Sequence, residues 1–159
     1  MKILRPHHTN YCVSNIDGSI KFYRDGLGFE LVQDAVRENI ESYDVIFNHP
    51  GMKLRVALFQ LPNLEMFLEL FEMINPRREE REQHFRFVGS PHVAYQVEDI
   101  DALHEHMTGL GYKFLNPPVK VIRDGITIAR GAYLLDPDGI IVELFELAPE
   151  DQMVMPGKS

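Results

Sequence analysis

The sequence is poor in cysteine, in basic residues and in long apolar runs. Cys12 is the single cysteine among 159 residues, so no disulfide can form within the chain, which fits a cytoplasmic setting. The net charge of −8 argues against the basic surface of a nucleic-acid-binding protein. No apolar stretch approaches the roughly 20 residues of a membrane helix, and the first residues lack the apolar segment of a signal peptide. We therefore expect a cytoplasmic protein with no nucleic-acid or membrane partner.

The length suits one compact domain with its own hydrophobic core. Alternation of apolar and polar residues, together with turn and capping residues, predicts short strands and two helices. The strands are expected at 8–13, 29–32, 43–47, 54–59, 65–71, 92–97, 119–122, 127–135 and 140–145, and the helices at about 16–23 and 100–108. The polar residues 33–40 are expected to form a loop or an edge. This mixture of elements predicts an α+β fold.

The second half of the sequence repeats the first in order. Four residues recur at a spacing of 84, namely His8 and His92, Val13 and Val97, Ile16 and Ile100, and Asp17 and Asp101. The Gly-Leu-Gly segments at 26–28 and 109–111 recur at a spacing of 83, and Glu69 recurs as Glu143 at a spacing of 74. Chance does not readily supply all these matches in order, so we predict two copies of one supersecondary unit.

The repeat divides the chain into module one, about 5–74, a linker, about 75–89, module two, about 90–147, and a tail, 148–159. The linker is dense in charges of both signs, which is typical of a solvated connection. The functional alternatives for it are a lid or a dimer contact, with Phe85 and Phe87 anchoring its end. The tail contains prolines and a glycine and is expected to be loose or to pack as an arm.

Each module ends on an apolar strand that contains an acid. Glu69 lies in Phe-Leu-Glu-Leu-Phe-Glu and Glu143 in Ile-Val-Glu-Leu-Phe-Glu. A buried carboxylate is unfavourable unless it is paired or binds a metal. Each module also places a histidine, His8 or His92, at the head of its first strand. If the two modules pack with these faces inward, two imidazoles and two carboxylates converge, a set that suits Zn²⁺, Fe²⁺, Mn²⁺, Co²⁺ or Ni²⁺.

Other polar residues have alternative interpretations. A shift of the first strand by one residue would replace His8 by His7. For Glu69 the alternative to a metal ligand is a carboxylate held in a salt bridge, and Glu72 lies nearby. Cys12 would share the face of His8, although we predict a small buried hydrophobe there. Three residues are candidates for contacting an anionic or carbonyl substrate, namely Arg55, Arg130 and Tyr133. The other histidines are expected on the surface or on helices, namely His49, His84, His104 and His106.

These motifs resemble the vicinal oxygen chelate superfamily, which includes glyoxalase I, methylmalonyl-CoA epimerase, extradiol dioxygenases, and fosfomycin and bleomycin resistance proteins. The resemblance covers roughly residues 5–147. Its motifs are His8 with Phe22-Tyr23 and Gly26-Leu27-Gly28-Phe29, Leu68-Glu69-Leu70, His92 through Asp101, Asp136-Pro137-Asp138-Gly139, and Glu143-Leu144. It implies two tandem βαβββ modules forming a curled mixed sheet around a cleft with one divalent metal ion. Carried over residue by residue, the metal ligands are His8, Glu69, His92 and Glu143.

The resemblance also implies a chemistry. In this superfamily the metal commonly binds two adjacent substrate oxygens and stabilises an enolate, and Glu143 or Glu69 would move the proton. The four-ligand set is similar to those of glyoxalase I and the epimerases, although an epimerase more often has glutamine in place of Glu69. We expect an isomerase or lyase that acts on a small 2-oxo or 2-hydroxy acyl compound, and members of the superfamily often form homodimers.

Two alternatives stay open. An extradiol ring-cleaving dioxygenase keeps two histidines and one glutamate and leaves positions for oxygen and substrate, so a ligand at Glu69 counts against it. From another class, the protein would be a binding module that sequesters a small molecule such as a drug, with the metal absent or structural. No glutathione-binding or CoA-binding signature is evident.

Overall fold

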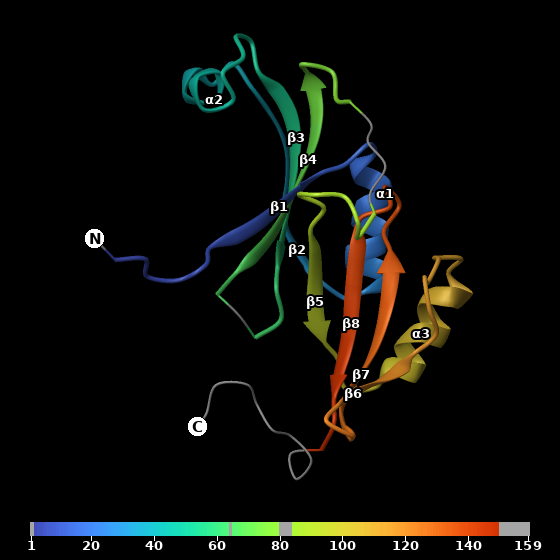
Figure 1. Cartoon of the computed structure of the whole chain (residues 1–159). Helices are drawn as coiled ribbons and strands as arrows, with labels where there is room; N and C mark the ends of the chain where they lie inside the picture. The colour runs from blue at the N-terminus through green and yellow to red at the C-terminus, as the bar shows by residue number, and fades with distance from the viewer. Residues whose placement is uncertain (1, 64, 80–83, 150–159) are drawn as a thin grey trace. The chain divides into compact units, whose positions relative to one another are not determined.

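The computed structural model describes residues 2–63, 65–79 and 84–149, and the chain divides into two compact units, Met1–Arg81 and Glu82–Ser159 (Figure 1). Each unit contains a strand, a helix and three further strands, and unit 1 has an additional helix between its second and third strands. The expected α+β fold of two tandem βαβββ modules is confirmed, and each module forms its own four-stranded mixed sheet. The tail beyond Pro149 and part of the expected linker, at 80–83, lie outside the described residues.

Unit 1 is built around a sheet in the order β1-β4-β3-β2. Its elements are β1 (His8–Cys12), α1 (Ile16–Ile20), the π-helical continuation η1 (Lys21–Gly26), β2 (Glu30–Glu38), α2 (Glu41–Ile46), β3 (Lys53–Gln60) and β4 (Phe67–Asn75). The first strand runs parallel to the last one, while the other neighbours are antiparallel. The two ends of the module therefore lie side by side in the sheet.

Unit 2 repeats this topology with the order β5-β8-β7-β6. Its elements are β5 (His92–Gln96), α3 (Ile100–Gly109), β6 (Val119–Arg123), β7 (Ile126–Leu135) and β8 (Ile141–Leu147). Again the first strand is parallel to the last. Among the described helices the longest, α3, has ten residues, and none is long and apolar enough to cross a bilayer.

The helix of each unit covers one side of its sheet, which we call the helix face. In unit 1 the ring of Tyr23 lies 5.9 Å from that of Phe59, and both side chains are fully buried. In unit 2, Ile100 of α3 and Leu144 of β8 are buried in the same way. Because alternate residues of a strand point to opposite sides, the next residues form a second side of each sheet, which we call the open face. In unit 1 the helix α2 covers one end of that face, where Tyr43 and Phe47 pack against Leu54 and Val56.

The predicted starting points of the two helices, near residues 16 and 100, are confirmed. The Asn15 side chain accepts hydrogen bonds from the backbone N–H groups of Asp17 and Gly18, at 3.1 and 3.2 Å. Asp99 does the same for Ala102 at 2.9 Å. These bonds satisfy donors that have no partner within the helix.

One predicted strand, at 43–47, is wrong, because Glu41–Ile46 forms the helix α2. Tyr43, Val45 and Phe47 alternate as in a strand, but Tyr43 and Phe47 are also four residues apart and share one side of a helix. Both rings pack against a buried cluster, whose members are Met52, Leu54 and Val56, while Val45 is 75% exposed. The Asp44 carboxylate closes the turn by accepting the N–H groups of Gly51 and Met52.

The connection that contains α2 is where the two modules differ most. It joins β2 to β3 over residues 39–52, whereas the corresponding connection between β6 and β7 is the two-residue turn Asp124-Gly125. Both turn residues have positive φ values, 51° and 79°, as a type I′ hairpin requires. In unit 1 the polar residues after Val32 continue β2 as an edge strand, which was one of the two predicted outcomes.

Candidate functional site

The histidine and glutamate predicted as ligands in module one lie together on the open face of the first sheet. His8 pairs with Phe67 across the parallel strands, and Asn10 pairs with Glu69. The His8 Nε2 atom is 3.7 Å from the Glu69 Oε2 atom. The glutamate side chain is 21% exposed and the histidine 45% exposed, so the carboxylate is sheltered and the imidazole is accessible.

The second module places the equivalent residues in the same arrangement. His92 pairs with Ile141 and Ala94 with Glu143 across β5 and β8. The distance from His92 Nε2 to Glu143 Oε2 is 3.3 Å, and the glutamate side chain is 15% exposed. The sequence repeat is therefore also a repeat of a His–Glu pair on the open face.

The donor atoms of the second pair lie at a spacing that suits a divalent metal, and those of the first pair lie slightly farther apart. Two ligands bound at about 2.1 Å to one ion lie roughly 3.0–3.4 Å apart. The Nε2–Oε2 distance is 3.3 Å in unit 2, within that range, and 3.7 Å in unit 1, just outside it. Imidazole and carboxylate are also the ligands that Zn²⁺, Fe²⁺ and Mn²⁺ accept. Within the described part of the chain, no group of three or more His, Cys, Asp or Glu side chains is placed to hold a metal. Each unit by itself contributes two donors.

The two glutamates have different neighbours. The Asn10 amide donates to the Glu69 backbone oxygen at 3.2 Å and to its Oε2 atom at 3.3 Å. Ala94 occupies the equivalent position of unit 2 and has no side-chain amide to donate. There, Tyr133 lies beside Glu143 in the register. Burial, together with the charge and hydrogen bonding of Glu143, raises the pKa of Tyr133, so its hydroxyl is a stable donor toward that carboxylate.

An aromatic group borders the second pair. The ring of Phe85 meets that of Tyr133 edge-on at 4.7 Å between centroids, and it lies 6.0 Å from the imidazole of His92. The Tyr133 and His92 rings are also 6.0 Å apart. Phe85 was expected only to anchor the end of the linker, so the sequence did not indicate this position. Asn10 was missed as well, although it lies two residues after His8 and so shares its face.

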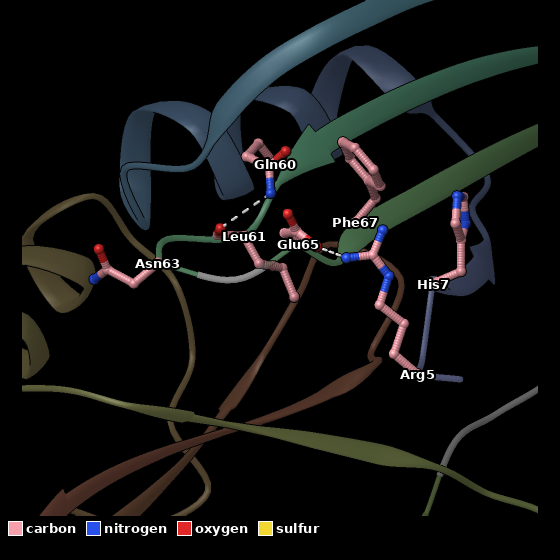
Figure 2. Close-up of a pocket in the computed structure, with 7 residues that line it drawn as sticks. All are labelled: Arg5, His7, Gln60, Leu61, Asn63, Glu65 and Phe67. Carbon is pink, nitrogen blue, oxygen red and sulfur yellow. Dashed lines mark hydrogen bonds and ion pairs between the residues drawn. The ribbon is translucent and has the colours of Figure 1, made fainter. Parts of the chain in front are cut away.

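His8 is the histidine that faces Glu69, and His7 occupies a different position. The Nδ1 atoms of the two imidazoles are 2.8 Å apart. His7 lines a cavity of about 560 Å³ at the β3–β4 turn, with Arg5, Gln60, Leu61, Asn63, Glu65 and Phe67 (Figure 2). Figure 2 shows Arg5 reaching toward Glu65, with which it forms an ion pair. The two charges at the edge of this cavity therefore offset each other.

The two arginines considered for substrate contact are not brought together with the His–Glu pairs. Arg55 is on the helix face, where it binds Asp34 through two hydrogen bonds of 2.8 and 2.7 Å. It also forms an ion pair with Asp17 of α1 at 2.9 Å. Arg130 binds Asp101 of α3 through hydrogen bonds of 2.5 and 2.7 Å. These contacts raise the pKa of both guanidinium groups.

The arginines belong to a duplicated structural contact. In each unit, a glutamate of the last strand accepts the first N–H of the helix, from Ile16 to Glu72 at 3.1 Å and from Ile100 to Glu146 at 3.3 Å. The arginine of the neighbouring strand lies opposite that glutamate. The helix start is thus tied to the sheet in the same way twice. Of the three proposed substrate contacts, only Tyr133 lies beside a His–Glu pair.

Replacing Arg55 with glutamine should lower the free energy of unfolding by about 1–2 kcal/mol, because hydrogen bonds between charged groups are lost. Metal content should not change, because Arg55 lies on the face opposite Glu69. Urea unfolding of the wild type and R55Q at pH 7 measures the difference. A loss of bound metal in R55Q with unchanged stability would contradict this role.

The difference in unfolding free energy between the wild type and R55Q should be smaller in acid. Arg55 donates hydrogen bonds to Asp34 and lowers the pKa of its carboxyl in the folded chain. The pair therefore stabilises the fold fully above the ordinary aspartate pKa of about 3.9, and this contribution is lost as the pH falls through the lowered folded-state value. Unfolding at pH 7 and near pH 3 should show a smaller difference in acid. An equal difference at both pH values would exclude the carboxylate as the partner.

The remaining side chains show one more departure from expectation. Cys12 is exposed rather than buried, on the same face as His8. His104 and His106 lie on α3, and His49 follows α2 in a turn, as expected. The His84 Nδ1 atom accepts the backbone N–H of Arg86 at 3.2 Å. None of these four histidines takes part in the two pairs.

A unit that occurs twice, each copy with a His–Glu pair on its open face, defines a duplicated βαβββ protein. The chain belongs to the Glyoxalase/Bleomycin resistance protein/Dioxygenase superfamily, whose family model matches residues 5–144. The resemblance seen in the motifs is thereby confirmed. The fold agrees, since a glyoxalase family protein of Bacillus cereus matches with a TM-score of 0.82 at 22% identity, over 94% of this chain and 97% of that one.

Two relatives and one further solved structure resemble most of the chain. The chain is 30% identical over 155 residues to 2-epi-5-epi-valiolone epimerase of Actinomyces sp., covering 92% of this chain and 82% of the relative. It is 32% identical over 141 residues to the uncharacterized protein YaeR of Escherichia coli K12, covering 88% and 94%. An antibiotic binding protein of Streptomyces sp. CB03234, TnmS3, shares the fold with a TM-score of 0.62 at 18% identity, over 93% of this chain and 99% of that one.

Proposed function

We propose that the protein is a divalent-metal-dependent isomerase or lyase, acting on a small 2-oxo or 2-hydroxy acyl compound. The proposed ligands of a single metal ion are His8, Glu69, His92 and Glu143. The observation that carries this proposal is the recurrence in both modules of a His–Glu pair, with Nε2–Oε2 distances of 3.7 and 3.3 Å. A surface salt bridge contributes little to stability, so stability alone gives little reason for the His–Glu pair in each module.

The metal would act as a Lewis acid, drawing electron density from a carbonyl oxygen and making the neighbouring C–H bond more acidic. The chain itself must then take that proton and return it. Glu143 is the proposed proton carrier because its carboxylate is sheltered, at 15% exposure, and lies beside the Tyr133 hydroxyl. Tyr133 would hold the carboxylate in place by its hydrogen bond and limit access of water from that side.

The relatives support an isomerase over the alternatives. One is named as an epimerase, and an epimerase inverts a stereocentre, which a proton transfer next to a carbonyl accomplishes. The presence of a carboxylate at both Glu69 and Glu143 disfavours a ring-cleaving dioxygenase, which needs more open metal positions. The similarity to an antibiotic binding protein, at 18% identity, concerns the fold alone and does not favour a binding function.

Metal content and proton exchange test the proposal together. Protein purified without chelator should carry close to one divalent ion per chain, measured by plasma mass spectrometry. In heavy water it should incorporate deuterium next to the carbonyl of 2-hydroxy ketones, measured by NMR, without consuming oxygen. Oxygen uptake with catechol would favour the dioxygenase instead. Absence of both metal and exchange would leave the binding module as the better function.

A further inference from the structure

The open face of the second sheet differs from its helix face in the distribution of charge. Its four strands contain three cationic residues, namely Lys120, Arg123 and Arg130. Lys120 pairs with Arg130, and Arg123 with Ile126, so the register puts all three on the helix face. The face that carries Glu143 instead includes Tyr133, Gly131 and Val119. Along these strands, the open face therefore offers no lysine or arginine to a phosphate or carboxylate.

Aromatic side chains occupy this face where a ligand would approach the second His–Glu pair. Phe85 is 46% exposed, although its ring contacts both Tyr133 and His92. A phenyl ring that is half-exposed yet fixed edge-on to a tyrosine presents a flat apolar surface to solvent. Such surfaces stabilise rings and hydrocarbon faces of ligands through close packing. Phe85 comes from the segment before β5, outside the repeated βαβββ unit, so this feature belongs to unit 2 alone.

From these observations we infer that Phe85 and Tyr133 form a contact surface for the ring of an uncharged cyclic substrate, beside His92 and Glu143. The inference rests on the proposed function, because the two adjacent oxygens of the substrate would face the metal. It narrows the proposed substrate class to neutral cyclic 2-hydroxy ketones or diketones. The net charge of −8 over the whole chain likewise does not favour an anionic substrate.

Three probes that share the same 2-hydroxy ketone group distinguish the effect of a ring in the ligand from the effect of a negative charge. They are 2-hydroxycyclohexanone, which is cyclic and neutral, hydroxyacetone, which is acyclic and neutral, and dihydroxyacetone phosphate, which is acyclic and anionic. Binding of each to the zinc-loaded full chain can be measured by calorimetry. The cyclic probe should bind best and the phosphate worst. Equal binding of all three, or tightest binding of the phosphate, would overturn the inference.

Substitution of Phe85 tests whether this residue causes the preference for the cyclic probe. F85A should weaken binding of 2-hydroxycyclohexanone roughly three- to tenfold, the size expected of one aromatic contact, while hydroxyacetone binding stays within about twofold. The matched control is F87A, which removes a ring from the same segment that contacts His84 and Arg86 instead. F87A should leave both affinities unchanged. If F85A and F87A behave alike, Phe85 is not a ligand contact.

The same samples distinguish failure of this inference from failure of the metal centre. Zinc content of the wild type and of F85A should be equal, because Phe85 is not a proposed ligand. A wild-type chain that holds no zinc refutes the metal centre. A zinc-loaded chain that does not prefer the cyclic probe refutes only the aromatic contact.

Discussion

Replacing His92 with alanine should lower the affinity for a divalent metal by roughly 100-fold or more, since loss of a hydrogen-bond partner behind a ligand already costs about 10–100-fold. The remaining donor of that unit, Glu143, would lose the imidazole 3.3 Å away that completes its pair. Competition with a coloured chelator at fixed pH measures the affinity. His8→Ala should have an effect of similar size, because the two pairs are equivalent by the repeat.

His106→Ala is the matched control, because it removes an exposed imidazole from α3 of the same unit. It should leave metal affinity unchanged. The stoichiometry adds a second readout. If all four residues hold one ion, each single substitution removes most of the bound metal. If each pair bound its own ion, H92A would retain half of the metal, and the proposal of a shared ion would be wrong.

Replacing Glu143 with glutamine should slow deuterium exchange by about 10²–10⁴-fold, the usual contribution of a positioned acid or base. Glutamine has the same shape but does not take up a proton at neutral pH, so metal content should fall far less than exchange. The exchange rate of a 2-hydroxy ketone, followed by NMR on the metal-loaded protein, provides the measurement. Tyr133→Phe should reduce the rate less, because it removes only the hydroxyl that holds the carboxylate.

Replacing Glu69 with glutamine tests whether Glu69, rather than Glu143, moves the proton. Glu69 is more exposed than Glu143, at 21% against 15%, and the Asn10 amide already occupies part of its carboxylate. We therefore expect E69Q to keep its exchange rate within about tenfold of the wild type, since a glutamine oxygen still coordinates a metal. A larger loss in E69Q than in E143Q would assign the proton transfer to Glu69 instead.

The sequence predicted the architecture well because the repeat is a long-range signal. Matching of His8 with His92 and of Glu69 with Glu143 indicated two similar units, and both units have the same strand order. The failure at Tyr43–Phe47 has a local cause. Residues at positions 43, 45 and 47 alternate, while positions 43 and 47 also satisfy the helical spacing. The segment forms a helix because both rings then pack on Leu54 and Val56. That packing depends on residues outside the segment, so the segment alone could not distinguish the helix from a strand.

The two His–Glu pairs could be found in the sequence for the same reason. The four proposed ligands recur in the sequence, and the structure places each pair on the open face. Arg55 and Arg130 also recur, 75 residues apart, and with Asp17 and Asp101 this pairing could have indicated a repeated structural contact. Phe85 could not be found this way, because it lies outside the repeat and its contact with Tyr133 depends on how the chain returns to the sheet.

The parallel pairing of the first and last strands has a thermodynamic consequence. Each His–Glu pair joins residues from the two ends of its module, since β1 lies beside β4 and β5 beside β8. An unfolded chain cannot keep such donors together, so a metal held by them binds the folded state in preference. By mass action, metal at 100 times its dissociation constant would add about 2.7 kcal/mol to the unfolding free energy. The melting temperature would then rise with metal concentration and become a direct measure of ligation.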